Sequence, residues 1–406
     1  DPPTLEHFCS FIGASQASMA YFNYYQLMNE TRIPHPLPDY YQGSLCDNFD
    51  FGAFQIYRSD VLKKAASAMP SYRFAGLYDL RLRASEVSRI EHVNDYLYTV
   101  VQTDFRRSGE KQFDYLDAHN REAQLEMEEV CTQHLKRIDA YLPPSFLPVS
   151  FDEADFPLEA SIIIPVKNRA KTIADAIHSG LEQQTSFPFN LIVVDNHSTD
   201  GTTQIINDCT CRDNRVVHLI PQQENLGIGG CWNEAVNHQL CGKFAVQLDS
   251  DDLYSSPNTL QTIVNAFYEQ GCAMTVGSYL TTDFNLTPIP PGIIDHREWT
   301  DENGRNNALR INGLGAPRAF YTPLYRKINA PNISYGEDYA LGLAFSRDYR
   351  IGRIYDVLYL CRRWEENSDA DLDLNRIRLN SEMKDSIRTK EIYARIHKNS
   401  DLISKS

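Results

Sequence analysis

Residues 191–202 read LIVVDNHSTDGT, in which four apolar residues lead directly into a polar turn. Similar apolar runs occupy residues 161–164, 216–220 and 244–248. Between the runs, apolar residues recur at helical spacing, for example from residue 170 to residue 181. Continuous apolar strands that alternate with amphipathic helices are typical of a parallel sheet covered on both faces. The sequence therefore predicts an α/β fold with a Rossmann-like, mostly parallel sheet.

Polar residues follow three of these runs, at the points where the predicted strands end. They are residues 165–169 (PVKNR), residues 195–201 (DNHSTDG) and residues 249–252 (DSDD). Ligands of open parallel sheets bind beyond the carboxyl ends of the strands, so we expect these turns to line one site. Residues 195–201 would also suit a helix N-cap and turn alone, because Asp, Asn, Ser and Thr all cap helices. We favour the other interpretation, in which the carboxylate accepts hydrogen bonds from a base or a ribose hydroxyl.

Asp249, Asp251 and Asp252 place three carboxylates within four residues. One interpretation is a solvated acidic turn. The other is a divalent cation site, because a cation relieves the mutual repulsion of the carboxylates. Mg²⁺ typically binds through one or two carboxylates together with substrate phosphates. We therefore expect this turn to hold a nucleotide diphosphate through a divalent cation.

Five segments occur in an order and spacing that are specific when taken together. They are residues 163–168 (IIPVKN), 193–202 (VVDNHSTDGT), 225–227 (NLG, followed by Asn233), 248–252 (LDSDD) and 336–338 (GED). In these segments the chain resembles family 2 glycosyltransferases of the GT-A fold, and the resemblance covers residues 159–365. It implies a Mn²⁺- or Mg²⁺-dependent enzyme that moves a sugar from a nucleoside diphosphate-sugar to an acceptor hydroxyl. The implied setting is polysaccharide or glycoconjugate synthesis, with a glycan or glycolipid as acceptor.

The resemblance also implies roles for individual residues. Asp251 would ligate the metal that bridges the two phosphates, and Asp249 would face the ribose or the donor sugar as a second ligand. Asn196 stands where many family members carry an Asp, which leaves the nucleobase open. The residues implied in donor binding are Pro165, Val166, Asn168, Arg169, Asp195, Asn196, Asn225, Gly227, Asn233, Asp249, Ser250, Arg318, Arg363 and Trp364.

Glu337 and Asp338 begin a predicted helix in the second half of this region. Acidic residues in a first helical turn are favoured by the helix dipole, so a purely structural role is one interpretation. The resemblance implies a catalytic pair, in which Asp338 deprotonates the acceptor hydroxyl and the sugar is transferred with inversion. His296 is either a structural histidine or a neighbour of the metal or phosphate. Arg362 and Arg363 either form surface ion pairs or stabilise charge on the diphosphate.

The N-terminal part contains a weak internal repeat. Residues 78–98 align without gaps with residues 339–359. Where the second copy has the Glu-Asp pair, the first has Gly76 and Leu77. Internal repeats usually mean repeated structural units, so we interpret the first copy as a degenerate, non-catalytic acceptor half. Chance similarity between two helix–strand segments is the alternative.

The repeat and the Pro-containing stretch after residue 142 predict three parts. Residues 1–150 form an N-terminal α/β extension, residues 151–365 the catalytic GT-A domain, and residues 366–406 a C-terminal helical segment. Within these parts we expect helices over residues 120–142 and 369–396, the latter as one or two helices. The extension is expected to serve packing, dimerisation or acceptor binding, which leaves a homodimer open.

Composition narrows the partners and the compartment. The 406 residues carry 39 Lys and Arg against 54 Asp and Glu, a net charge of −15, which argues against nucleic acid as a partner. No apolar stretch approaches the length of a membrane-spanning helix. None of the nine cysteines shows zinc or redox spacing, and Cys209 and Cys211 are predicted to be buried thiols in a reducing compartment. These features predict a cytoplasmic protein, with peripheral contact at the inner face of the membrane as an alternative.

Two alternatives to an active glycosyltransferase remain. A non-catalytic glycan- or nucleotide-binding scaffold would share the fold, but the chain keeps Asp249, Asp251 and Asp338 together, which favours activity. A nucleotidyltransferase would need a glycine-rich phosphate loop with a lysine near the first strand. Lys167 has no glycines beside it and is a poor match.

Overall fold

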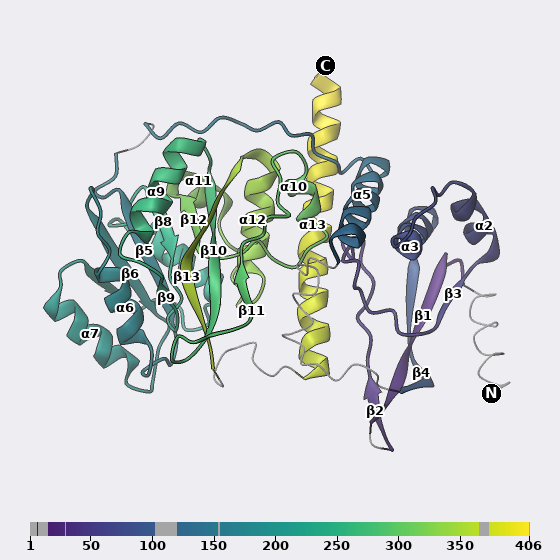
Figure 1. Ribbon diagram of the computed structural model, residues 1–406, viewed down its shortest axis with the longest axis horizontal. Helices are drawn as coiled ribbons and strands as arrows, with labels where there is room; N and C mark the ends of the chain where they lie inside the picture. The colour runs from purple at the N-terminus through teal and green to yellow at the C-terminus, as the bar shows by residue number, and fades with distance from the viewer. Residues whose placement is uncertain are drawn as a thin grey trace. The chain divides into compact units, whose positions relative to one another are not determined.

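The computed structural model describes residue 6 and residues 15–28, 30–101, 120–152, 155–364 and 373–405. The chain divides into two compact units (Figure 1). The small unit comprises Asp1–Pro143, Asn306–Asn312 and Asp371–Ser406, and the large unit comprises Pro144–Arg305 and Gly313–Ala370.

The first half of the large unit is a parallel sheet. Its strands are β5 (Ala160–Val166), β6 (Phe189–Asp195), β7 (Val216–Leu219) and β8 (Phe244–Gln247). β5 lies between β6 and β8, β7 pairs with β6, and all three pairings are parallel. The apolar runs are therefore confirmed as strands of a parallel sheet. Every residue of β6 and β8 is buried, whereas β7 buries only Val216. Their carboxyl ends bring the polar turns to one edge of the sheet.

The second half of the large unit makes the sheet mixed. It contributes β9 (Leu253–Tyr254), β10 (Met274–Asp283), β11 (Pro288–Ile294), β12 (Arg318–Tyr321) and β13 (Ile351–Arg363). β12 pairs antiparallel with both β8 and β10, whereas β13 runs parallel to β10. The strand order is β7-β6-β5-β8-β12-β10-β13-β9, with β11 paired to β10. This curled α/β sheet agrees with the predicted GT-A class.

Helices follow the strands as the apolar spacing predicts. They are α6 (Ile173–Leu181), α7 (Thr202–Arg212), α8 (Ile228–Asn237), α9 (Thr259–Gln270), α10 (Gly304–Asn307), α11 (Thr322–Ile328) and α12 (Glu337–Asp348). α6 packs with α7, while α8 packs with α11 and α12. The latter contact is close because Gly229 on α8 faces the chain before α12, where an added Cβ would lie 2.0 Å from the Pro331 carbonyl oxygen.

The small unit has a four-stranded sheet and four helices among its described residues. Its strands are β1 (Met19–Met28), β2 (Thr31–His35), β3 (Gln55–Tyr57) and β4 (Ile90–Val101). Its helices are α2 (Ser59–Ser67), α3 (Gly76–Val87), α5 (Arg121–Arg137) and α13 (Leu374–Lys405). α5 ends before the predicted boundary at residue 142, and α13 is one long helix (Figure 1). One hydrophobic cluster of this unit consists of Met19, Tyr21, Tyr24, Leu37, Phe51 and Ile90.

The small unit has the topology of the second half of the large sheet. The order β1-β2-β3-α2-α3-β4 corresponds to β10-β11-β12-α11-α12-β13 once α10, which lies between β11 and β12, is left out, and in both the first strand pairs with the other three. The registers also correspond: Met19 pairs with Tyr57 and Ile90, as Met274 pairs with Phe320 and Ile351. The aligned segments 78–98 and 339–359 therefore place helix on helix and strand on strand.

Two expectations from composition can be compared with the structure. No helix in the described part of the chain is long and apolar enough to cross a bilayer. Cys209 is buried as predicted, but Cys211 is exposed. The prediction for Cys211 is wrong because α7 buries only one face, and residues two positions apart on a helix do not share a face.

Candidate active site

The turns after β5 and β6 are bound to each other. The side-chain oxygen of Asn168 accepts a hydrogen bond from the Thr199 backbone (2.8 Å), and Ser198 Oγ accepts one from the Asn168 backbone (3.0 Å). Asn168 has a φ of 55°, a left-handed conformation that asparagine tolerates better than most residues. Thr202 Oγ1 accepts from the Arg169 backbone at 2.8 Å. The predicted donor residues of these two turns therefore form one rigid edge.

Asp195, at the end of β6, uses both carboxylate oxygens inside the protein. Oδ1 accepts from the Ser198 backbone (2.9 Å) and Oδ2 from the Thr203 hydroxyl (2.5 Å). Burial raises the pKa of Asp195, but the bonds from Ser198 and Thr203 outweigh it and leave the pKa below its ordinary value. The next residue differs: Asn196 donates to the Leu226 carbonyl at 2.8 Å, while its buried Oδ1 has no hydrogen-bond partner among the described residues. Asn196 therefore offers an open acceptor.

The acidic turn after β8 is partly buried and electrostatically strained. Asp249 donates its backbone N–H to the Tyr359 hydroxyl (2.8 Å), and Asp252 accepts from the Arg362 backbone (2.8 Å). Burial raises the pKa of Asp252 well above its ordinary value, and the charges of Asp249 and Asp251 raise it further. Burial likewise raises the pKa of Asp249, against the attraction of nearby Arg318. Additional positive charge would stabilise this turn.

Asp251 is held by the end of β13. The Trp364 indole donates to Asp251 Oδ2 at 3.3 Å, and Arg169 Nε lies 3.8 Å from the same oxygen. Lys171 lies 5.6 Å from the centre of the Trp364 ring. These contacts bring the predicted donor residues Arg169 and Trp364 to the acidic turn.

A metal at this turn would depend on few protein ligands. Among the described residues there is no group of three or more His, Cys, Asp or Glu that could hold one. His296 is buried, and its Nδ1 lies 2.8 Å from a carboxylate oxygen of Glu298. The repelling carboxylates of Asp249 and Asp251 nevertheless fit a cation that completes its coordination with diphosphate oxygens and water.

The acidic pair lies at the start of α12, and Arg318 links it to the acidic turn. Asp338 Oδ2 lies 2.7 Å from Arg318 Nη1. Burial lowers the pKa of Arg318, but the charges of Asp338, Asp249 and Glu337 outweigh it and raise the pKa. The guanidinium of Arg318, the first residue of β12, is therefore close enough to interact electrostatically with all three carboxyl groups.

Glu337 is the buried member of the pair. Its Oε2 has no hydrogen-bond partner among the described residues, and 9% of the residue is exposed. Burial, followed by the charge of Asp338, raises the pKa of Glu337 to about 8. The two neighbouring carboxyl groups therefore have opposed environments: Glu337 is buried and keeps its proton at neutral pH, whereas Asp338 contacts a guanidinium.

Three further predicted donor residues, Asn225, Gly227 and Asn233, have structural partners or lie at the surface. Both polar side-chain atoms of Asn233 bond to Ala330, at 2.9 and 3.0 Å. Gly227 donates its N–H to the Asn332 side chain at 2.7 Å. Both residues fix the loop that leads to α12, and Asn225 is exposed.

The sequence of the large unit matches the family model described as glycosyl transferase family 2 over residues 161–327. The matched residues include both strand-end turns, the acidic turn and Arg318. This region is a family 2 glycosyltransferase domain.

Relatives of the glycosyltransferase domain include bacterial enzymes of glycan synthesis. The putative teichuronic acid biosynthesis glycosyltransferase TuaG of Bacillus subtilis is 30% identical over 150 residues, which are 37% of this chain and 58% of that protein. Chondroitin synthase of Escherichia coli is 32% identical over 130 residues, 31% of this chain and 18% of that protein. The chain thus spans less than two thirds of these relatives. The crystal structure of S. aureus TarS 1-349 in complex with UDP-GlcNAc has 22% identity and a TM-score of 0.44, covering 58% of this chain and 72% of that one.

Two contacts of the glycosyltransferase domain were not predicted from the sequence. The hydroxyl of Tyr359, a buried residue of β13, accepts a hydrogen bond from the Asp249 N–H, and the Gln247 amide donates to Asp249 Oδ2 at 2.9 Å. Tyr359 follows the acidic turn by over a hundred residues, and only its buried strand position hints at a partner. Gln247 is a signal that could have been used, because it is the single polar residue in the apolar run 244–248.

Proposed function

We propose that the chain is an inverting glycosyltransferase that moves a sugar from a nucleoside diphosphate-sugar to the hydroxyl of a glycan or glycolipid. The observation that carries the proposal is the placement of Arg318 between Asp338 and the acidic turn. This arrangement puts a proton acceptor beside a group that attracts a departing anion. The resemblance to glycan-synthesising enzymes supports polysaccharide or glycoconjugate synthesis as the setting.

The donor would lie along the carboxyl edge of the sheet. The open Oδ1 of Asn196 is suited to accept a hydrogen bond from the nucleobase. Asp249 and Asp251 would hold Mn²⁺ or Mg²⁺, and the bound cation would neutralise charge on the diphosphate. Arg362 is 2% exposed and its Nη2 has no hydrogen-bond partner among the described residues, so it offers a further donor to a phosphate oxygen.

Transfer then requires one proton movement and one displacement. Asp338 takes the proton of the acceptor hydroxyl, whose oxygen forms a bond to the anomeric carbon. The bond between that carbon and the diphosphate oxygen breaks on the opposite face, and the electron pair leaves with the diphosphate. Arg318 stabilises the ionised form of Asp338 before transfer, by Coulombic attraction.

The experiment is a donor screen on the full chain. UDP-, GDP- and dTDP-sugars, each with Mn²⁺ and with EDTA, are tested for thermal stabilisation, since a ligand of the native state raises stability by mass action. We expect metal-dependent stabilisation by one nucleotide and transfer to a hydroxyl acceptor with an inverted anomeric centre. A product that keeps the anomeric configuration of the donor would contradict inversion. Donor binding without transfer to any acceptor would favour a non-catalytic scaffold.

A further inference from the structure

The hairpin between β10 and β11 carries an exposed aromatic residue close to the acidic turn. β10 ends at Asp283, which pairs with Arg363 on the parallel strand β13. The residues that follow this pair are Phe284 and Trp364, and their ring centroids lie 5.5 Å apart. Phe284 is 39% exposed. The large unit therefore presents an apolar ring to solvent at the end of β13.

The turn that carries Phe284 is held by the Asp283 carboxylate. Asp283 Oδ1 accepts hydrogen bonds from the backbone N–H groups of Asn285 (2.9 Å) and Thr287 (2.8 Å). The Asp283 carbonyl also accepts from the Leu286 N–H at 3.1 Å. Asp side chains commonly close turns through bonds to the backbone two residues on. These bonds place Phe284 at the tip of the hairpin without the help of a ligand.

Two side chains at the end of β13 connect Phe284 to the acidic turn. The guanidinium carbon of Arg362 lies 5.1 Å from the centre of the Phe284 ring, and Arg362 Nε donates to the Asp251 carbonyl oxygen. The Trp364 indole, on which Phe284 packs, donates to Asp251 Oδ2 at 3.3 Å. The exposed ring is therefore continuous with the candidate active site.

An apolar ring with an exposed face is suited to bind the ring of a sugar. Many pyranoses have one face that carries only C–H groups, which lose contact with water when they pack on an aromatic ring. The hydroxyl groups at the edge of the pyranose stay hydrated. In the proposed function the nucleobase and the diphosphate of the donor already have other partners, in the strand-end turns and at Asp251. The acceptor is the sugar that remains for Phe284.

We infer that Phe284 is an acceptor subsite, on whose exposed face the pyranose ring of the acceptor glycan packs beside the Trp364 indole. The inference rests on the proposed function, in which the acceptor is a glycan or glycolipid. It gives the second half of the large unit a binding residue for the acceptor. A purely structural role, in which the ring only covers the Arg362 guanidinium, is the competing explanation.

Trp364 is a reporter that requires neither a donor nor transfer. The chain has three tryptophans, and the other two, Trp232 and Trp299, are buried. The full chain, isotopically labelled at its indole nitrogens, is titrated with the methyl glycosides of glucose, N-acetylglucosamine and glucuronic acid at millimolar concentration. Trp364→Phe assigns the resonance. We expect a saturable shift of the Trp364 resonance with at least one of these glycosides.

Variants of exposed aromatic residues locate the binding site. Phe284→Ala should weaken binding of that glycoside about tenfold, because the apolar face of the sugar then stays in water. Tyr355→Ala is the matched control: Tyr355 is 43% exposed and lies 5.3 Å from the Arg297 guanidinium. It also lies on β13, but about 20 Å along the strand from Arg362. The control should bind like the parent, and Phe284→Tyr should retain binding.

Two results of this titration would overturn the inference. One is a glycoside affinity of Phe284→Ala equal to that of the parent. The other is the absence of a saturable Trp364 shift with all three glycosides. Because the titration uses neither donor nor turnover, failure of the subsite is distinguishable from failure of the proposed function.

A kinetic readout separates acceptor binding from a structural cover over Arg362. With an acceptor that the parent glycosylates, Phe284→Ala should raise KM for the acceptor about tenfold. Thermal stabilisation by the donor nucleotide with Mn²⁺ should be unchanged. Loss of this donor stabilisation, with KM for the acceptor unchanged, would assign the ring to Arg362 and the diphosphate and would overturn the inference.

Discussion

The molecule contains the same supersecondary unit twice, with different chemistry. In the large unit, β12 begins with Arg318 and α12 with Glu337 and Asp338. In the small unit, the corresponding residues are Gln55 on β3 and Gly76 and Leu77 on α3, and 79% of Leu77 is exposed. The backbone pairing is shared, so the difference lies in side chains. The comparison teaches that this arrangement of strands and helices forms without the charged residues. The proposed transfer activity therefore depends on a few side chains and not on the fold itself.

The two copies also use corresponding residues for different bonds. The hydroxyl of Tyr98 accepts from Ala53 within the small unit (3.1 Å), whereas that of Tyr359 accepts from Asp249 of the acidic turn (2.8 Å). β12 pairs on its outer side with β8, but β3 pairs with β1 alone among the described strands. The large unit's copy therefore forms the candidate site together with the parallel half of the same sheet, which supplies the strand-end turns.

Removal of a negative charge from the acidic turn should have the largest effect on the rate of transfer. In Asp251→Ala, transfer should fall about a thousandfold and metal-dependent stabilisation by the donor should disappear, because the diphosphate loses its cation. Differential scanning fluorimetry with Mn²⁺ and with EDTA measures the second effect. Asp208→Ala, an exposed Asp on α7, is the control and should behave like the parent. Full metal-dependent donor binding by the Asp251 variant would contradict this assignment.

Substituting Arg318 with the residue of the small unit should have the next largest effect. Arg318→Gln removes the ion pair with Asp338 and takes a positive group from the site, so initial rates of transfer should fall about a hundredfold. Gln55→Ala at the corresponding position should leave the rate unchanged. Equal rates in parent and Arg318→Gln would mean that the arginine is not part of the site.

Glu337 should make the stability of the fold depend on pH. Its folded-state pKa of about 8 exceeds the ordinary 4.5, so stability is greatest below pH 4.5 and falls as the pH rises through 8. Glu337→Gln removes this cost and should be more stable than the parent at pH 9, by up to about 5 kcal/mol. Urea unfolding across the pH range measures the difference. A difference that does not vary with pH would contradict the raised pKa.

The smallest effect on stability and on the rate of transfer is expected at Leu77, the residue of the small unit that corresponds to Asp338. Leu77→Asn introduces a polar side chain at an exposed site, so the free energy of unfolding should change by about 0.5 kcal/mol or less. The transfer rate should stay that of the parent. A clear loss of transfer in this variant would show that the small unit takes part in the chemistry itself.

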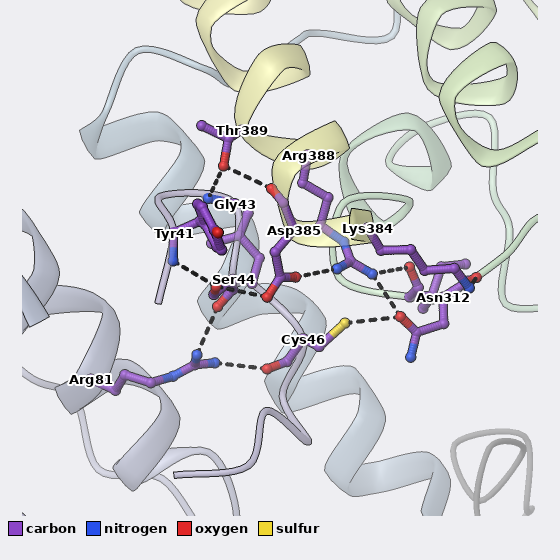
Figure 2. A network of polar contacts seen from close by, with 12 residues as sticks. Tyr41, Gly43, Ser44, Cys46, Arg81, Asn312, Lys384, Asp385, Arg388 and Thr389 are labelled. Carbon is purple, nitrogen blue, oxygen red and sulfur yellow. Dashed lines mark hydrogen bonds and ion pairs between the residues drawn. The ribbon is translucent and has the colours of Figure 1, made fainter. Parts of the chain in front are cut away.

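Much of this account could be predicted because local patterns determine it. The runs at residues 161–164 and 191–194 are strands with turns at their carboxyl ends, and neighbouring parallel strands bring those turns together. The roles inside the site were less predictable. Asp195 and Asn233 were expected to bind the donor, but their bonds to Thr203 and Ala330 depend on distances that only the folded chain sets. Residues 306–312 show no periodic pattern, since their partners lie on α5, on α13 (Figure 2) and in the loop between β2 and β3, far along the chain.

The most direct measurement is the rate of transfer by Asp338→Asn beside that by Leu77→Asn, with donor binding measured for both. The account predicts that Asp338→Asn loses about a hundredfold in rate while it still binds the donor, because only proton removal is lost. Leu77→Asn should transfer at the parent rate. Transfer by Asp338→Asn at the parent rate would contradict the central claim that the charged copy of the repeat carries the reaction.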